Sequence, residues 1–220
     1  MTTESIRSSL DVALFPIPNM VAFPGTKVPL HIFEPRYRSM INDCVRDQRM
    51  LAISHTRKQI SDDKPHQDLT QALSKNQASY EAFEVFSAGD CSLIETTEDG
   101  RMYVEVKVLK RLRLVQKKQE IPYQIVTCEV FDDEIESNDE QALSLQQDIN
   151  AALMAISELQ SPALNELLKK PDWQELTPQD FSFQFFRFIR FESDLMQEIL
   201  ESNSVTQRLQ IIWERLKIAV

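Results

Sequence analysis

The hydrophobic residues of this chain change their spacing once, and the change divides the sequence into two parts. Before residue 132 they recur at every second position or in short runs, which is typical of β-strands. From residue 141 onward they recur three and four positions apart, which is typical of amphipathic helices. Residues 132–140 hold six acidic residues and no basic one, a pattern typical of a solvated segment. We therefore expect a β-rich domain at 1–131, an acidic hinge at 132–140 and a helical bundle at 141–220.

The first part contains seven segments with strand character and one helix. Pro29 predicts that its strand lies at the edge of a sheet, because proline cannot donate to a ladder. Glu98-Asp99-Gly100 has the chemistry of a hairpin turn, and a helix with one apolar face, which includes Tyr37, Cys44 and Val45, is expected to begin at Pro35. A long irregular loop is expected at 56–79. The segments form a small mixed barrel-like domain, with strands at 12–17, 28–33, 49–54, 83–87, 91–95, 104–114 and 123–131.

Capping residues mark the helices of the second part. Residues 142–159 have helical spacing, and Ser161-Pro162 is expected to end that helix. Thr177-Pro178-Gln179-Asp180 predicts the start of another, with threonine as the N-cap and proline at the first position. Ser204 predicts the start of a last helix, whose apolar residues are Val205, Leu209, Ile212 and Leu216. The C-terminal third is therefore expected to be helical.

Six of the twelve phenylalanines lie between residues 181 and 191. On one continuous helix they cover a wider face than a single buried side requires. The helix then either packs on two sides or presents aromatic rings to solvent, framed by arginines. The second alternative predicts a surface that holds an apolar segment of a polypeptide or a second copy of the chain. That candidate surface comprises Phe183, Phe186, Arg187 and Arg190.

Several classes of function find no support in the residues. A net charge of −10 argues against a general nucleic-acid binder, which needs a clustered positive surface. The three glycines, Gly25, Gly89 and Gly100, fit neither a dinucleotide-binding fingerprint nor a phosphate-binding loop. The N-terminus lacks a basic segment followed by a long apolar one, so no signal peptide is expected. No stretch of about 18 apolar residues occurs, so no transmembrane helix is expected. We expect a soluble cytoplasmic protein that does not contact membranes.

The three cysteines lie far apart and lack Cys-x-x-Cys spacing, which predicts reduced and mostly buried thiols. A nucleophile pair of Cys44 with His31 is conceivable. Cys44, however, falls on the apolar face of its predicted helix, where cysteine acts as a small hydrophobic residue. Cys91 and Cys128 have no partner of this kind in sequence. No catalytic residue and no cofactor are predicted.

Two further histidines, His55 and His66, flank Asp62 and Asp63, which raises the question of a metal site. Their spacing matches no known ligand motif, so no metal is predicted. A basic run begins within the strand at 104–114, continues past its end, and raises the question of an RNA-binding patch. Its aromatic neighbours are few, although stacking on aromatic rings is what single-strand binding normally requires. The run comprises Lys107, Lys110, Arg111, Arg113, Lys117 and Lys118.

The segment from Leu14 to Cys44, LFPIPNMVAFPGTKVPLHIFEPRYRSMINDC, resembles the opening of the Lon N-terminal domain family. It matches the family pattern FP-G-x-x-x-PL-x-IFE-x-RY-x-x-M. Later blocks at 89–94, 99–114 and 199–209 resemble the family as well, although the family usually has a glycine where this chain has Val108. The resemblance therefore covers nearly the whole chain. Its matching residues include Pro24, Gly25, Pro29, Phe33, Glu34, Arg36 and Tyr37.

The resemblance implies an α+β protein with a PUA-like pseudo-β-barrel followed by an α-helical bundle. It also implies a non-catalytic module that recognises unfolded polypeptide or a partner protein, without ATPase or peptidase domains. The motif residues are expected to be mainly structural, with Gly25 in a turn, Glu34 and Arg36 linking strand to helix, and Tyr37 packed beneath them. A PUA-like small-molecule or RNA-binding protein that uses Arg111 and Arg113 remains the alternative. Assembly into a homo-oligomer stays open.

Overall fold

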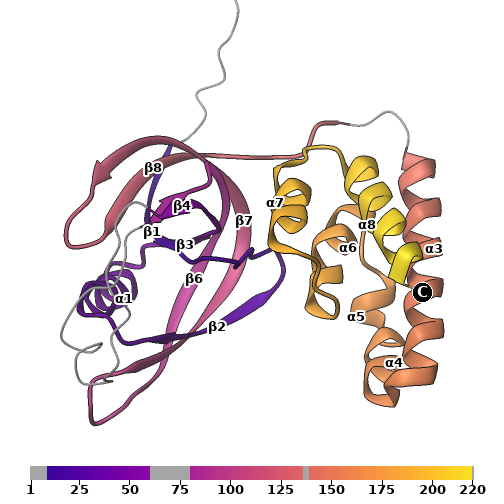
Figure 1. Cartoon of the computed structure of the whole chain (residues 1–220), viewed down its shortest axis with the longest axis horizontal. Helices are drawn as coiled ribbons and strands as arrows, with labels where there is room; N and C mark the ends of the chain where they lie inside the picture. The colour runs from indigo at the N-terminus through magenta and orange to yellow at the C-terminus, as the bar shows by residue number, and fades with distance from the viewer. Residues whose placement is uncertain (1–8, 60–79, 136–138, 220) are drawn as a thin grey trace, which may run out of the picture. The chain divides into compact units, whose positions relative to one another are not determined.

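The computed structural model describes residues 9–59, 80–135 and 139–219 of the chain (Figure 1). It divides into two compact units, Met1–Phe131 and Asp132–Val220. The first unit is built from strands and one helix, and the second from helices alone within its described residues. This arrangement confirms the α+β class that the change in hydrophobic spacing predicts. None of the helices in the described ranges is long and apolar enough to cross a bilayer.

A six-stranded sheet forms the first unit, in the order β2-β7-β6-β3-β1-β8. Because β8 also pairs with β7, five of the strands close into a barrel and β2 extends from it (Figure 1). β1 and β3 run parallel, whereas the other pairs are antiparallel. The mixed barrel-like prediction is therefore confirmed. The strands are β1 (Leu10–Pro16), β2 (Lys27–Ile32), β3 (Leu51–Ser54), β6 (Val85–Thr96), β7 (Met102–Gln119) and β8 (Gln124–Val130).

The pairing of β6 with β7 shifts register between Ala88 and Gly89. A side chain at Gly89 would place its Cβ 1.9 Å from the carbonyl oxygen of Lys107, so only glycine fits this position. The irregularity is therefore present although Val108 stands where the family usually has glycine. At the other end of the hairpin, Gly100 has φ +82°, as the predicted turn requires.

The helix of the first unit, α1 (Pro35–Asp47), begins at Pro35 as predicted. It buries Tyr37, Met40, Ile41 and Cys44 against the barrel strands, while Val45 is exposed and was wrongly expected on the apolar face. The helix ends where Gln48 adopts a left-handed conformation and Arg49 N donates to Cys44 O at 3.0 Å.

The expected irregular loop at 56–79 is wrong over its first residues. Thr56–Gln59 forms β4, which pairs antiparallel with β5 (Tyr80–Ala82). The local sequence is polar, so the strand owes its existence to a backbone partner more than twenty positions away. Residues 60–79, including Asp62, Asp63 and His66, lie outside the described residues. Of the four residues considered for a metal site only His55 is described, and it is buried with its Nδ1 accepting a hydrogen bond from Asn19 N at 3.1 Å.

The second unit contains the predicted helices, and their caps lie where the sequence placed them. Thr177 Oγ1 accepts a hydrogen bond from Asp180 N at 3.1 Å, and Ser204 Oγ accepts one from Gln207 N at 3.0 Å. The first helix ends at Gln160 before Ser161, as expected, but it begins inside the acidic block. The helices are α3 (Asp139–Gln160), α4 (Pro162–Leu168), α5 (Pro171–Gln174), α6 (Pro178–Gln184), α7 (Ser193–Glu201) and α8 (Val205–Ala219).

The phenylalanine-rich segment is not one continuous helix. α6 ends at Gln184 and a 3₁₀ turn, η1 (Phe185–Arg187), follows before α7. Phe183 lies within α6 and is only 4% exposed, and the break changes the direction of the side chain of Phe186, which is 9% exposed. The prediction that Phe183 and Phe186 form an outward-facing aromatic surface is therefore wrong.

Candidate functional site

A pocket of about 440 Å³ lies in the first unit, beside β2. Its walls come from four segments that are separate in sequence: the end of β1 with the loop that follows it, the strand β2, the first turn of α1, and Tyr80 at the start of β5. Pro16 and Pro18 end the first strand and lead the loop away, and Pro35 starts the helix directly after β2. The lining residues are Phe15, Pro16, Ile17, Pro18, Met20, Pro29, Leu30, His31, Ile32, Phe33, Glu34, Arg36, Tyr37 and Tyr80.

One ion pair forms the charged part of the pocket wall. Arg36 Nη2 lies 2.9 Å from Glu34 Oε2, and Arg36 Nε donates to the same oxygen at 3.0 Å. The two side chains are 12% and 10% exposed. Because a charge this deeply buried is costly unless it is paired, each residue stabilises the other. The remaining wall is mostly apolar, as is usual for sites that bind organic ligands.

Tyr37 connects this ion pair to the core. The guanidinium of Arg36 lies 4.6 Å from the centre of the Tyr37 ring, and the Phe15 ring centre lies 4.3 Å from it on β1. Burial raises the pKa of Tyr37 to about 12, so its hydroxyl is neutral at physiological pH. The phenol therefore serves as a packed, neutral wall of the pocket.

The structure brings five of the seven family-motif residues to this pocket and leaves two outside it. Gly25 has φ +78° in the turn before β2, where its N–H donates to Val108 O at 3.0 Å. Pro24 precedes it and neither residue lines the pocket. The turn fixes where β2 begins, and β2 in turn lines the pocket. The five residues at the pocket are Pro29, Phe33, Glu34, Arg36 and Tyr37.

The candidate nucleophiles of the described residues are held in their protonated form. Burial raises the pKa of Cys44 and of Cys128 to about 12, and that of Cys91 to about 11. His31 is exposed and stacks on Tyr103 with ring centres 4.7 Å apart. Cys44 and His31 therefore do not offer the thiolate that a nucleophilic pair needs. Within the described part of the chain, no three His, Cys, Asp or Glu side chains form a metal-binding group.

Several members of the basic run along β7 are buried or already have a partner. Arg111 is only 3% exposed, and its guanidinium lies 4.7 Å from the centre of the Phe131 ring. Arg113 lies 4.4 Å from the same ring, and Lys118 pairs with Asp11 at 2.5 Å. The expectation that Arg111 contributes to a surface patch is therefore wrong. The shifted register of β6 and β7 changes the alternation of side chains along the strand.

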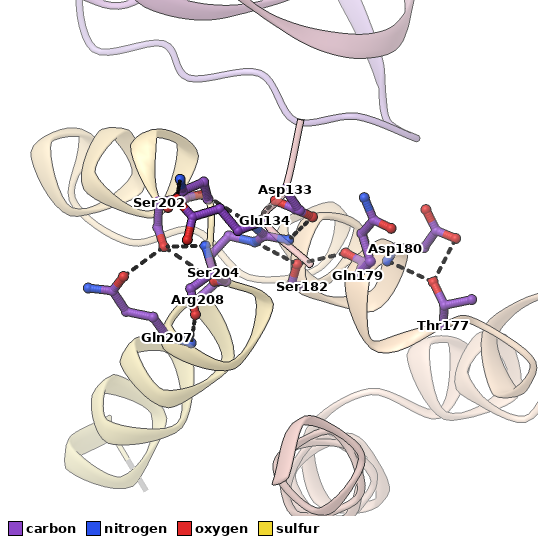
Figure 2. A network of polar contacts seen from close by, with 11 residues as sticks. Asp133, Glu134, Thr177, Gln179, Asp180, Ser182, Ser202, Ser204, Gln207 and Arg208 are labelled. Atoms are coloured by element: carbon purple, nitrogen blue, oxygen red, sulfur yellow. Dashed lines mark hydrogen bonds and ion pairs between the residues drawn. The ribbon is translucent and has the colours of Figure 1, made fainter. Parts of the chain in front are cut away.

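Sequence reasoning missed a buried arginine in the second unit. Arg208 is fully buried on α8, and its guanidinium pairs with the Asp133 carboxylate at 2.5 and 2.8 Å (Figure 2). Its Nε donates to Ser182 Oγ at 3.0 Å, and the Phe183 ring centre lies 4.2 Å from Cζ. The signal was present in the sequence, because Arg208 occupies the predicted apolar face of its helix between Val205 and Leu209.

This ion pair corrects the expectation for the acidic block. Asp133 was expected to be solvated with its neighbours, yet its side chain is only 8% exposed. Glu134 is also attached to the helices, because its N–H donates to Asn203 O at 2.9 Å. The first residues of the block therefore belong to the helical unit. Arg187 and Arg190, by contrast, are exposed as expected.

Comparison with known proteins agrees with the motif analysis. The family model of the ATP-dependent protease La (LON) substrate-binding domain matches residues 11–217. Lon protease 1 of Herpetosiphon aurantiacus is 24% identical over 204 residues, and the match covers 90% of this chain and 23% of that protein. The chain thus spans less than a quarter of the length of this relative.

Two solved structures share the fold. The N-terminal domain of the Mycobacterium avium complex Lon protease has a TM-score of 0.69 at 14% identity, covering 96% of this chain and all of that one. A Lon N-terminal domain protein from Xanthomonas campestris has a TM-score of 0.56 at 14% identity, covering 92% of this chain and 96% of that one. Since the family model spans nearly all of its 220 residues, this chain belongs to the family of LON substrate-binding domains.

Proposed function

We propose that this chain is a non-catalytic module that binds unfolded polypeptide through the pocket beside β2. The observation that carries the proposal is the pocket itself, which residues of the family motif build and apolar side chains line. Unfolded polypeptides expose the apolar side chains that folded proteins bury, and such side chains gain free energy on leaving water. The module would therefore distinguish unfolded from folded clients.

The size and polarity of the pocket agree with this class of ligand. A volume of about 440 Å³ lies within the range of sites that hold compact organic groups, and it accommodates large side chains. The charge of Arg36 is compensated by Glu34 at 2.9 Å, so the wall favours apolar over acidic groups. Phe15, Ile17 and Met20 are partly buried hydrophobic residues packed against the core, with surface left to cover.

The proposal includes no chemistry on the bound polypeptide. The thiols of the described residues are protonated at neutral pH, and Tyr37 is neutral. Any cleavage of a client would then fall to a partner such as a separate protease. The proposal also places the module in the cytoplasm, where reduced cysteines persist. A small-molecule or RNA-binding role that uses Arg111 and Arg113 has less support, because Arg111 is buried and Lys118 is paired.

Binding to β-casein, an unfolded protein, tests the proposal. Labelled β-casein is titrated with the chain and followed by fluorescence anisotropy, with native ubiquitin as the folded comparison. Ile17→Asn is expected to weaken binding about tenfold, because it removes one apolar side chain from the pocket. Leu114→Asn is the matched control, since Leu114 is also partly buried but packs against the other core cluster.

The same variants are compared by thermal unfolding. A loss of casein binding confined to Ile17→Asn, at comparable thermal midpoints, supports the pocket. Equal binding of casein and native ubiquitin, or no casein binding at all, contradicts the proposal.

A further inference from the structure

The strand β2 provides a free edge of the six-stranded sheet. β8, at the other end of the strand order, also pairs with β7 and so has a neighbour on both sides. Among the strands in the described residues, β2 pairs with β7 alone (Figure 1). An edge of this kind presents unpaired backbone N–H and C=O groups to a further strand.

The pocket lies along this edge. Successive side chains of a strand point to opposite faces of the sheet. The five consecutive residues from Pro29 to Phe33 nevertheless border the same pocket. A single cavity can touch both faces of one strand only where it passes along the strand's edge. The pocket therefore gives access to the backbone of β2 as well as to its side chains.

The hydrogen-bond ladder shows which backbone groups face the pocket side. Val108 N donates to Thr26 O at 2.9 Å, and the register continues without a shift from Lys27 opposite Lys107 to Ile32 opposite Met102. Antiparallel ladders alternate between residues bonded to the partner and residues facing away. The backbone N–H and C=O groups therefore point toward β7 at Val28, Leu30 and Ile32. They point away from β7 at Lys27, Pro29 and His31.

The position of Pro29 agrees with this assignment. Its missing N–H falls on the outward side, where proline costs no ladder bond. Within the pocket, the outward edge then offers the N–H and C=O of His31 and the C=O of Pro29. These groups can form hydrogen bonds with two residues of an extended polypeptide. Only His31 can both donate and accept, because Pro29 has no N–H.

We propose that an extended segment of a polypeptide client adds to the sheet as a strand along the free edge of β2, opposite His31, and inserts an apolar side chain into the pocket. This inference rests on the proposed function and specifies how that site takes its client. Backbone pairing supplies affinity that does not depend on sequence, and the pocket selects for an apolar side chain at alternate positions. Such a combination suits a client that is recognised by its unfolded state.

The probe is a labelled eight-residue peptide of alternating threonine and leucine, with a lysine and a blocked group at each end. His31→Pro removes the outward N–H and places a ring in the path of an incoming strand. It is expected to weaken peptide binding about tenfold relative to His31→Ala, which keeps the backbone donor. Pro29→Ala adds a donor at the edge and is expected to bind the peptide as tightly or more tightly.

A second measurement leaves the protein unchanged. The same peptide, N-methylated at its central residues, keeps its side chains but loses the donors that the edge requires, and is expected to bind about tenfold more weakly. If the unmethylated peptide and β-casein bind but neither N-methylation nor His31→Pro matters, strand addition is wrong while the proposed function stands. If neither ligand binds, the proposed function itself fails. A dimer in sedimentation that His31→Pro converts to monomer would assign the edge to a second copy and overturn the proposal.

Discussion

At the scale of single residues, both units depend on charges that are buried with a partner. Glu34 and Arg36 form such a pair at the pocket, and Asp133 and Arg208 form another among the helices. A buried ion pair contributes little net stability, but the loss of one partner leaves an uncompensated charge. Each pair therefore affects the free energy of unfolding mainly when one of its members is replaced.

Asp133→Asn is expected to destabilise the helical unit by about 3 kcal/mol, because Arg208 loses its counterion in a fully buried position. Both tryptophans, Trp173 and Trp213, lie in this unit, so tryptophan fluorescence during urea unfolding follows it selectively. Asp132→Asn is the matched control, since its neighbour Asp132 is exposed. A change below about 0.5 kcal/mol in Asp133→Asn, within the range of ordinary surface substitutions, would show that the pair is dispensable.

At the scale of elements, α1 and β2 together create the pocket. The helix begins directly after the strand, so the same short stretch supplies the edge, the ion pair and Tyr37. α1 is held against the barrel by buried Tyr37, Met40, Ile41 and Cys44. Two of these groups are titratable, which makes the attachment of the helix sensitive to alkaline pH.

The barrel is expected to lose stability as the pH rises from about 9 to about 12. Burial raises the pKa of Tyr37 and of Cys44 to about 12, whereas the unfolded groups ionise near 10 and 9. The raised pKa values mean that the fold favours the neutral forms, so their contribution is complete below pH 9 and is lost on approaching pH 12. These separations correspond to about 3 kcal/mol for Tyr37 and about 4 kcal/mol for Cys44.

Urea unfolding followed by circular dichroism at pH 8, 10 and 11 measures this loss. Tyr37→Phe should make the decline shallower, because phenylalanine has no proton to lose. An unchanged free energy of unfolding up to pH 11 would be inconsistent with burial of these groups.

At the scale of the whole molecule, the chain divides into two compact units whose boundary can be located in solution. We propose that the boundary lies in the acidic segment 132–140, where low hydrophobicity and like charges favour exposure of the backbone. Asp133 pairs with Arg208, and Glu134 N donates to Asn203 O. We therefore expect cleavage in the later residues of the segment. The family match extends across this boundary, from residue 11 to residue 217.

Limited digestion with a protease directed at acidic residues is expected to cut first within 132–140 or within 56–79. Mass spectrometry of the earliest products identifies the cleavage positions. Early cleavage restricted to the strands between residues 101 and 131 would refute the proposed boundary, since those strands are paired on both sides over much of their length.

The sequence by itself determined the types of the elements, many of their ends and the family. Thr177 and Ser204 begin their helices through hydrogen bonds within one turn, and Pro35 through its restricted backbone, all of which local sequence controls. Tertiary structure alone decided the rest. Asp133 meets Arg208 across 75 positions, the break after Gln184 turns Phe186 inward, and the pocket forms where β1, β2 and α1 converge. Residue patterns report local preferences, whereas contacts between distant segments depend on how the whole chain packs.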